Sequence, residues 1–364
     1  LKSDFNVFVF DLTALFRPDF FKKKYNSTYY FEGYHSIESR KTFLSLLKRS
    51  TVNIAIDFLD ISRNSYFIRN KIKSRGGLIV KVLSGQQPKP PMQKKLKKVK
   101  NYLSKISRLS EIGFVVHKLL VPRKHFYSDF IMTGGLSGLN EIAVKYSKEV
   151  IPSHSFDYDL FLKIDNSLKS EREEKYVVYI DQYYAKHPDL EFMGEESFID
   201  ENNFYPLLES FFLDFERVTR LKVIVAAHPR SQYELYPDLF GHRKLVRGKT
   251  AELIKESEMV LLHTSTAISF AVLWEKPLLF LTSNEIINSF VHLDVLSFSH
   301  FFSKRALNMD NYTVQEINNK LQKSYSKDNY QKYQDNYLKY PGSPNVNNWQ
   351  IFADFFSHKF NNTD

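Results

Sequence analysis

Short apolar runs alternate with amphipathic or charged segments along most of the chain. In the first half, apolar runs of strand length occupy residues 6–11, 52–57, 78–83, 113–116, 129–133 and 148–152. Between two of these runs, residues 65–74 have helical spacing and stop at Gly76-Gly77. Regular alternation of strands and helices predicts a mostly parallel sheet with helices on both faces.

A charged stretch with few apolar residues, 166–175, interrupts this pattern before it starts again. The second half contains predicted strands at residues 176–180, 221–227, 244–246, 259–262 and 278–281, with predicted helices at 204–220, 251–257 and 267–274. Polar helical sequence rich in Lys and Tyr follows. We therefore expect two doubly wound α/β domains, at residues 1–165 and 166–312, and a helical segment at 313–364 that packs back across the domains.

The composition is that of a globular protein with a large core. Among the 364 residues, 32 Phe and 22 Tyr supply apolar area that argues against intrinsic disorder. The absence of cysteine excludes disulfide scaffolds, thiolate metal sites and cysteine nucleophiles, and it fits a reducing compartment. No apolar run reaches the roughly 20 residues of a membrane-spanning helix, and no signal peptide opens the chain. We therefore expect a cytoplasmic protein.

The chain carries 51 Lys and Arg against 41 Asp and Glu, and this net charge of +10 favours anionic partners. The densest basic run contains Lys94, Lys95, Lys97, Lys98 and Lys100. Its apolar residues have helical spacing, so the run fits either a solvated helix face or a contact with anionic lipid headgroups. Because it lacks the interleaved aromatic residues of a single-strand binder, we expect no nucleic-acid partner.

The strongest chemical signal is His228-Pro229-Arg230, which directly follows the predicted strand 221–227. Ligands of doubly wound sheets bind beyond the carboxyl ends of the strands. An imidazole and a guanidinium at that edge can donate hydrogen bonds to phosphate oxygens. A loop histidine whose polar atoms bind only the backbone is the alternative interpretation.

A second signal, His263-Thr264-Ser265-Thr266, follows the predicted strand 259–262 and precedes an apolar helix. Hydroxyl residues at such a junction cap the helix, and the helix N-terminus attracts anions. Alone, this pattern fits a plain helix cap equally well. Together with His228, it predicts a cradle for a phosphate or diphosphate.

A third segment, Gly248-Lys249-Thr250, lies between these two signals. We expect Thr250 to cap the following helix and Lys249 to reach an anion, with a nucleoside lying over Gly248. It is not a P-loop, because the spaced glycine before the Lys-Thr pair is missing. A simple turn before a helix is the alternative.

Further candidates lie at other predicted strand ends. Gly134-Gly135 precedes a helix expected from about Leu139, and adjacent glycines allow a ligand to approach the backbone closely. Asp181-Gln182 opens a long loop, where it fits either a donor or acceptor contact or a turn at the domain boundary. Tyr30 and Tyr34 belong to an early aromatic cluster that fits stacking on an acceptor sugar or ordinary packing.

The order of these segments resembles the bacterial GT-B glycosyltransferases, and most of all the sialyltransferase-like and Kdo-transferase-like groups that use CMP-activated sugars. In those groups a His-Pro motif and a later Ser/Thr motif hold the nucleotide phosphate, and here His228-Pro229 and Ser265-Thr266 match them. The resemblance covers roughly residues 176–282. It implies two Rossmann-like domains that face each other across a cleft, with the nucleotide-sugar bound by the C-terminal domain.

The resemblance also implies a reaction. A CMP-linked acidic sugar, sialic-acid-like or Kdo-like, is transferred to a glycan or glycolipid acceptor during synthesis of lipopolysaccharide, capsule or another bacterial surface polysaccharide. Inversion at the sugar is expected, with neither a metal nor a cofactor, at the inner face of the cytoplasmic membrane. The Asp157-Tyr158-Asp159 triplet fits the start of a helix better than a metal site.

Transfer to a hydroxyl needs a group that accepts its proton. The family's acidic motif, an Asp or Glu pair followed by Gly in the N-terminal domain, has no clean copy in this chain. Asp60 and Asp57, at the end of the strand 52–57, are the favoured bases. Asp11, Glu141 and His154 are further candidates, and each of these residues also fits a cap or a surface group.

Other functions remain open at this point. A UDP- or GDP-sugar-dependent transferase and a nucleotide-sugar 2-epimerase fit the same architecture. A non-enzymatic nucleic-acid-binding protein fits the net charge but predicts charge spread along a groove. A peripheral scaffold without activity is the remaining alternative.

Overall fold

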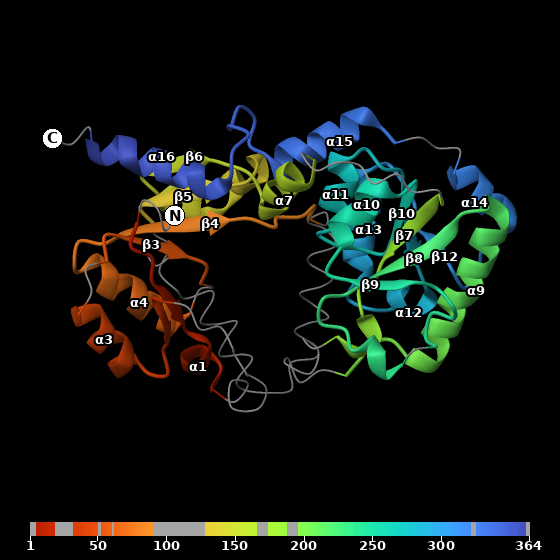
Figure 1. The fold of residues 1–364 in the computed structure, drawn as a ribbon, viewed down its shortest axis with the longest axis horizontal. Helices are drawn as coiled ribbons and strands as arrows, with labels where there is room; N and C mark the ends of the chain where they lie inside the picture. Colours follow the sequence, from red (N-terminus) through yellow and green to blue (C-terminus); the bar gives the residue numbers. More distant parts are fainter. Residues whose placement is uncertain are drawn as a thin grey trace. The chain divides into compact units, whose positions relative to one another are not determined.

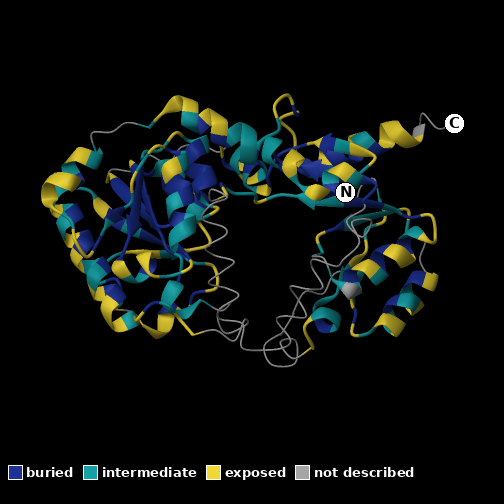
Figure 2. Ribbon diagram, turned by 180° about the vertical axis from the view of Figure 1, so that it is seen from behind, coloured by how far each residue is buried: buried dark blue, intermediate teal, exposed yellow. Residues whose placement is uncertain are grey.

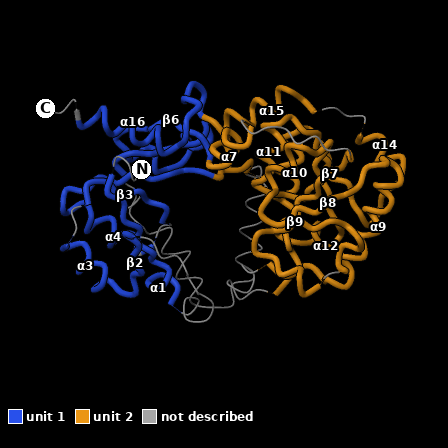
Figure 3. Tube along the Cα trace, viewed as in Figure 1, with its two compact units in different colours: residues 1–84, 108–155, 340–364 blue, residues 85–107, 156–339 orange. Residues whose placement is uncertain are grey.

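The computed structural model describes residues 5–18, 32–49, 52–59, 62–89, 128–165, 174–187, 196–236, 238–321 and 325–361 (Figure 1). These residues form two compact units (Figure 3). Unit 1 contains the described residues up to 84, those of 128–155 and those from 340 onward, and unit 2 contains 85–89 and the described residues of 156–339. Each unit has its own parallel sheet, and its buried residues concentrate in the strands and the inner helix faces (Figure 2).

Unit 1 is built on a parallel sheet in the order β3-β4-β5-β6. Its strands are β3 (Ile54–Asp57), β4 (Leu78–Leu83), β5 (Phe130–Thr133) and β6 (Glu149–Pro152). A separate parallel pair is formed by β1 (Val9–Asp11) and β2 (Tyr34–Ser36). The helices are α1 (Thr13–Phe16), α3 (Arg40–Arg49), α4 (Arg63–Lys73) and α16 (Asn348–Asn361), with 3₁₀ segments η2 (Leu136–Asn140) and η3 (Ile142–Tyr146).

Successive residues of β4 pack on opposite faces of this sheet. Ile79 joins a cluster with residues of α3 and α4, whereas its neighbour Val80 joins Phe356 of α16. Because side chains of a strand alternate between the two faces, one apolar run supplies both layers. Helices therefore cover both faces of the sheet, as the sequence predicts.

Unit 2 is built on a six-stranded parallel sheet in the order β12-β11-β10-β7-β8-β9. Its strands are β7 (Tyr176–Ile180), β8 (Lys222–Ala227), β9 (Leu245–Arg247), β10 (Met259–Leu262), β11 (Leu278–Thr282) and β12 (Leu307–Asn308). From β7 the chain builds outward through β8 to β9, and it then returns to the other side of β7 for β10, β11 and β12. The central strand β7, buried throughout, thus has β8 on one side and β10 on the other.

Helices lie on both faces of the second sheet, which confirms the expected doubly wound pattern. One face packs against α9 (Glu201–Thr219) and α14 (Val314–Leu321). The other packs against α7 (Phe156–Asp165), α10 (Thr250–Glu256), α11 (Ile268–Leu273) and α15 (Lys327–Tyr333). The remaining segments are α12 (Asn284–Ile287), α13 (His292–Phe301), η4 (Tyr184–Lys186), η5 (Tyr233–Leu235) and the π-helical η6 (Gln334–Leu338).

The units divide the chain at different points from those expected. Apart from residues 85–89, the described part of unit 2 starts with α7 rather than at residue 166, because α7 contacts α10 and α11. Of the C-terminal segment 313–364, the part before residue 340 belongs to unit 2 and the part from Tyr340 onward to unit 1. His154 and Asn348 join that last part to the end of β6, since the Asn348 Nδ2 donates to the His154 carbonyl at 2.8 Å.

Some elements of the structure differ locally from those predicted from the sequence. The helix expected from about Leu139 is replaced by η2 and η3, separated by the extended residue Glu141 (φ −73°, ψ 139°). The strand expected at residues 113–116 lies outside the described residues. Asp157 and Asp159 lie in the first turn of α7, as expected. Within the described parts of the chain, no helix is long and apolar enough to cross a membrane.

Candidate functional site

The main predicted residues of unit 2 lie at the carboxyl edge of its sheet, close to the central strand β7. Asp181 follows β7, His228 follows β8 and His263 follows β10. Because the sheet is parallel, these strand ends lie along one edge, and the ends of β8 and β10 are about 10 Å apart, twice the spacing of adjacent strands. The loops after β7 and β10 leave in opposite directions, which defines the switch point where doubly wound sheets bind ligands.

Asp181 is a buried carboxylate, 5% exposed, that ties together the loops after β7 and β8. Its Oδ1 accepts a hydrogen bond from the Tyr183 N–H at 2.9 Å. Its Oδ2 accepts from the His228 N–H at 3.1 Å and from the Tyr233 hydroxyl at 2.9 Å. Burial raises the pKa of Asp181, and these hydrogen bonds oppose the increase. The carboxylate is thus turned into the protein, where its bond to the Tyr183 N–H fits the turn that the sequence left open beside a donor or acceptor contact. Gln182, partly buried beside it, donates to the Asp181 carbonyl at 3.3 Å.

The His228 side chain is half-buried and held in a defined orientation. Its Nδ1 accepts the Arg230 N–H at 3.3 Å, and this arrangement favours the neutral tautomer with the proton on Nε2. The Tyr183 ring stacks parallel to it, with centroids 6.4 Å apart and an interplanar angle of 12°, and the His187 ring lies 4.8 Å away. The Ser231 hydroxyl donates to the His228 carbonyl at 2.7 Å and closes the turn.

Pro229 and Arg230 are both exposed in this turn. Both residues therefore lie at the surface, two residues or fewer along the chain from His228.

His263 lies in the core, away from any ligand surface. Its side chain is 0% exposed, with Nδ1 2.9 Å from the Leu281 carbonyl and Nε2 3.1 Å from the Tyr179 hydroxyl. Burial lowers the pKa of His263 from 6.5 to about 4, so the ring is neutral at pH 7. The expected contact between His263 and the nucleotide does not fit this geometry, because the residue packs behind the carboxyl edge.

The hydroxyl residues that follow His263 stay closer to the surface. Thr264 and Ser265 are partly exposed and Thr266 is exposed. The Ser265 Oγ accepts the Ala267 N–H at 3.2 Å and shapes the turn that leads into α11. The three residues therefore lie between β10 and α11, as expected. None of them caps α11, because its N-cap residue is Ala267 and no side chain caps the helix.

The turn at Gly248 precedes α10 at the end of β9. Gly248 has φ +75°, a left-handed conformation that glycine adopts easily, and a Cβ there would meet open space. Lys249 is exposed and is the N-cap residue, without a side-chain cap, whereas Thr250 is already the first helical residue. The expected Thr250 cap is therefore wrong, because the helix starts one residue earlier.

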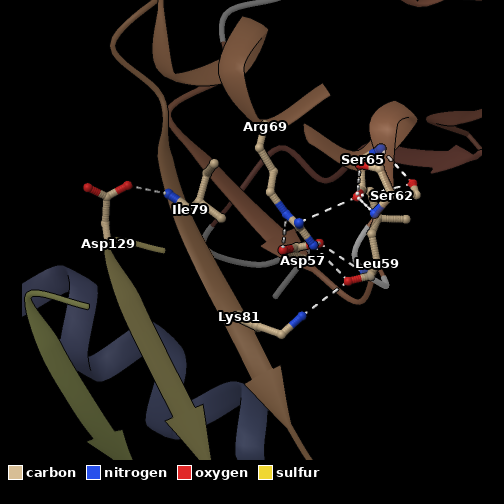
Figure 4. A network of polar contacts seen from close by, with 8 residues as sticks. All are labelled: Asp57, Leu59, Ser62, Ser65, Arg69, Ile79, Lys81 and Asp129. Atoms are coloured by element: carbon tan, nitrogen blue, oxygen red, sulfur yellow. Dashed lines mark hydrogen bonds and ion pairs between the residues drawn. The ribbon is translucent and has the colours of Figure 1, made fainter. Parts of the chain in front are cut away.

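In unit 1, Asp57 is the centre of a buried polar network (Figure 4). Its carboxylate accepts from the Arg69 Nε at 2.8 Å and from the Leu59 N–H at 2.9 Å. Arg69 and Lys81 both donate to the Leu59 carbonyl, at 2.7 and 3.1 Å. Both oxygens of this buried carboxylate accept hydrogen bonds from its own chain, so the network favours a structural role for Asp57. Asp60, the other favoured base, lies outside the described residues.

The remaining predicted residues of unit 1 contact their own chain. A Cβ on Gly134 would lie 2.8 Å from the Ser155 nitrogen, so the glycine permits close packing within the protein, not the expected approach of a ligand. Gly135 is buried and extended, with φ 174°. The Tyr34 hydroxyl donates to Asp11 at 2.6 Å. Tyr30 and the basic run Lys94–Lys100 lie outside the described residues.

Sequence reasoning missed the aromatic side chains around His228. Tyr183, His187 and Tyr233 contact the imidazole or its supporting carboxylate, although none of them follows a strand directly. The only available signal was Asp181 at a strand end, since a buried acid needs nearby donors. Across the described residues, no group of three or more His, Asp or Glu is arranged to hold a metal ion.

Comparisons with known proteins identify solved structures with a similar fold. No family model matches the chain, and no curated protein matches it. The UDP-GlcNAc 2-epimerase from Methanocaldococcus jannaschii superposes with a TM-score of 0.50 at 9% identity, over 90% of this chain and 86% of that chain. The putative UDP-N-acetylglucosamine 2-epimerase from Listeria monocytogenes gives 0.48 at 12% identity over 88% and 78%. CalG4, the calicheamicin glycosyltransferase, gives 0.46 at 11% identity over 81% and 71%. At these identities the likeness concerns the fold alone, and that fold is GT-B, with two Rossmann-like α/β units.

Proposed function

We propose that the protein is a nucleotide-sugar-dependent glycosyltransferase whose unit 2 binds the nucleotide phosphate beside His228. The observation that carries the proposal is the placement of this imidazole at the carboxyl edge next to the central strand, with its Nδ1 facing the Arg230 N–H. The Ser265 and Thr266 hydroxyls stand at the end of the strand on the other side of β7. Ligands of doubly wound sheets bind at this edge.

The chemistry of sugar transfer explains why such groups are needed. When the bond to the anomeric carbon breaks, negative charge develops on the departing phosphate. Preorganised donors at that position stabilise the transition state more than the ground state. The His228 Nε2–H and the Ser265 and Thr266 hydroxyls would bind the phosphate oxygens, and the exposed Arg230 and Lys249 side chains would add positive charge.

The proposed donor is a CMP-linked acidic sugar, and the proposed acceptor is a glycan or glycolipid of a bacterial surface polysaccharide. Support comes from the match of His228-Pro229 and Ser265-Thr266 to the motifs of CMP-sugar transferases. The reaction inverts the anomeric carbon without a metal, and Asp60 is the proposed base. Asp57 is not retained in that role, because Arg69 neutralises it.

Binding of nucleotides to the full chain tests this proposal. We expect CMP, tested beside CDP, UDP, GDP and dTDP, to raise the melting temperature selectively, since a ligand at 100 times its Kd adds about 2.7 kcal/mol of stability. His228→Ala should remove this response while the variant stays folded. His242→Ala is the matched control, because His242 is an exposed histidine of the same unit, and it should respond like the wild type. No response to any nucleotide, or undiminished binding by His228→Ala, would contradict the proposal.

A nucleotide-sugar 2-epimerase is the second candidate, because the solved structure with a TM-score of 0.50 is a UDP-GlcNAc 2-epimerase. An epimerase changes a free nucleotide-sugar, whereas a transferase needs an acceptor. Incubation with UDP-GlcNAc alone separates the two functions. Formation of the 2-epimer without an acceptor would establish the second candidate.

We also propose that Lys94, Lys95, Lys97, Lys98 and Lys100 hold the protein to the inner face of the cytoplasmic membrane. Co-sedimentation with vesicles that contain phosphatidylglycerol tests this contact. Binding should fall with salt and should be absent for vesicles of phosphatidylcholine alone. Equal binding to both kinds of vesicle would contradict an electrostatic contact.

A further inference from the structure

The His228 imidazole depends on a buried acid that touches both the histidine and the ring that packs on it. Asp181 accepts the backbone N–H of His228 through one oxygen and that of Tyr183 through the other. The Tyr183 ring in turn stacks on the imidazole. We infer that Asp181 is a positioning residue, which fixes the placement and the tautomer of His228 without contacting the substrate. The effect of Asp181 on catalysis rests on the proposed function of His228.

Only a carboxylate satisfies the donors that converge here. Oδ2 receives both the His228 N–H and the Tyr233 hydroxyl, and Oδ1 receives the Tyr183 N–H. A carboxylate has two acceptor oxygens, whereas an asparagine has one oxygen and an NH₂ group that donates. In Asp181→Asn, the NH₂ group would face at least one of these donors. Such a mismatch inside a buried site is costly.

Tyr183 needs this support because its backbone is in the left-handed region, with φ +53°. A non-glycine residue in that conformation is strained and persists only where its surroundings hold it. The hydrogen bond from the Tyr183 N–H to Asp181 is one such restraint. Loss of the acid would release Tyr183 and His228 together.

The tautomer of His228 follows from the same restraint. The Nδ1 acts as an acceptor because the turn brings the Arg230 N–H to 3.3 Å from it. That turn starts at the His228 N–H, which Asp181 holds. If the turn loosens, Nδ1 loses its donor and the proton distributes over both ring nitrogens. A phosphate oxygen that needs Nε2–H would then be bound less tightly.

Three forms of the full chain, with ¹⁵N-labelled histidine, test the inference. In the wild type, the ¹⁵N shifts of neutral His228 should show the proton on Nε2. In Asp181→Asn they should show a mixture of tautomers, and the Kd for the nucleotide that binds the wild type should rise about tenfold or more, as expected when hydrogen bonds to a charged group are lost. Tyr233→Phe is the matched control, because it removes a donor from Asp181 but keeps the bond to His228. It should keep the wild-type tautomer and a Kd within about twofold.

An unchanged His228 tautomer and Kd in Asp181→Asn would overturn the inference, as would equal changes in both variants. The wild type supplies a readout that does not depend on the folding of a variant: the amides of His228 and Tyr183 should be protected from hydrogen exchange by the buried carboxylate. Fast exchange of both amides would overturn the inference too. If the wild type binds no nucleotide, the proposed function fails, but the tautomer still decides whether Asp181 positions His228.

Discussion

The buried histidine His263 makes the stability of unit 2 depend on pH in a specific way. The folded protein lowers the pKa of His263 to about 4, because the ring is fully buried between Tyr179 and the Leu281 carbonyl. In the unfolded chain, a histidine has a pKa of about 6.5. Protons therefore bind the unfolded state more tightly, and stability falls as pH decreases.

The size of the effect follows from these two pKa values. The contribution of His263 is fully present above about pH 6.5 and is lost as pH falls toward 4. Linkage gives a loss of about 2 kcal/mol between pH 7 and pH 5, and about 3 kcal/mol by pH 4. These values are a large fraction of the stability of a typical domain.

Urea unfolding at several pH values, followed by a probe in unit 2, measures this loss. His263→Gln keeps polar groups at the site but does not titrate, so its free energy of unfolding should be lower at pH 7 and should fall less steeply between pH 7 and pH 5. The control His242→Gln changes an exposed histidine and should keep the wild-type slope. If the curves of the wild type and His263→Gln are parallel, His263 is not the buried neutral group described here.

Other substitutions test particular packing and polar contacts. Arg69→Met leaves the Asp57 carboxylate buried without its cation, so urea unfolding of unit 1 should show a free energy of unfolding lower by about 3–5 kcal/mol. Adding Asp57→Asn should restore part of this stability, because it removes the unpaired buried charge. Gly134→Ala places a Cβ 2.8 Å from a backbone nitrogen and should lower the melting temperature through a loss of about 1–3 kcal/mol. In Gly248→Ala the new Cβ would contact no other atom, but the residue must adopt φ +75°. Calorimetry should therefore show a loss of stability of about 1–2 kcal/mol, and a smaller loss for Gly248→Asn.

The strands of unit 2 could be predicted closely because local pattern determines them. Residues 176–180 and 259–262 are short apolar runs bounded by polar residues, and the structure places β7 and β10 there. The position of His228 at a strand end follows from the same pattern, since it directly follows β8. The doubly wound class was predictable for the same reason.

What the sequence did not reveal depends on contacts between distant residues. His263 follows a strand as His228 does, but the Tyr179 hydroxyl and the Leu281 carbonyl bind it inside the core, and no local signal distinguishes the two histidines. Asp181 looked like a loop residue open to ligand, because its donors lie on another strand end and on η5. The return of the chain to unit 1 at residue 340 likewise depends on the packing of α16.

The placement of a nucleotide phosphate at His228 is tested most directly by ¹⁵N NMR of histidine-labelled protein during titration with CMP. The Nε2 resonance of His228 should move to saturation, while those of the buried His263 and the exposed His242 stay in place. A titration in which CMP binds but His228 does not respond, or in which no histidine responds at any concentration, would contradict the proposed site.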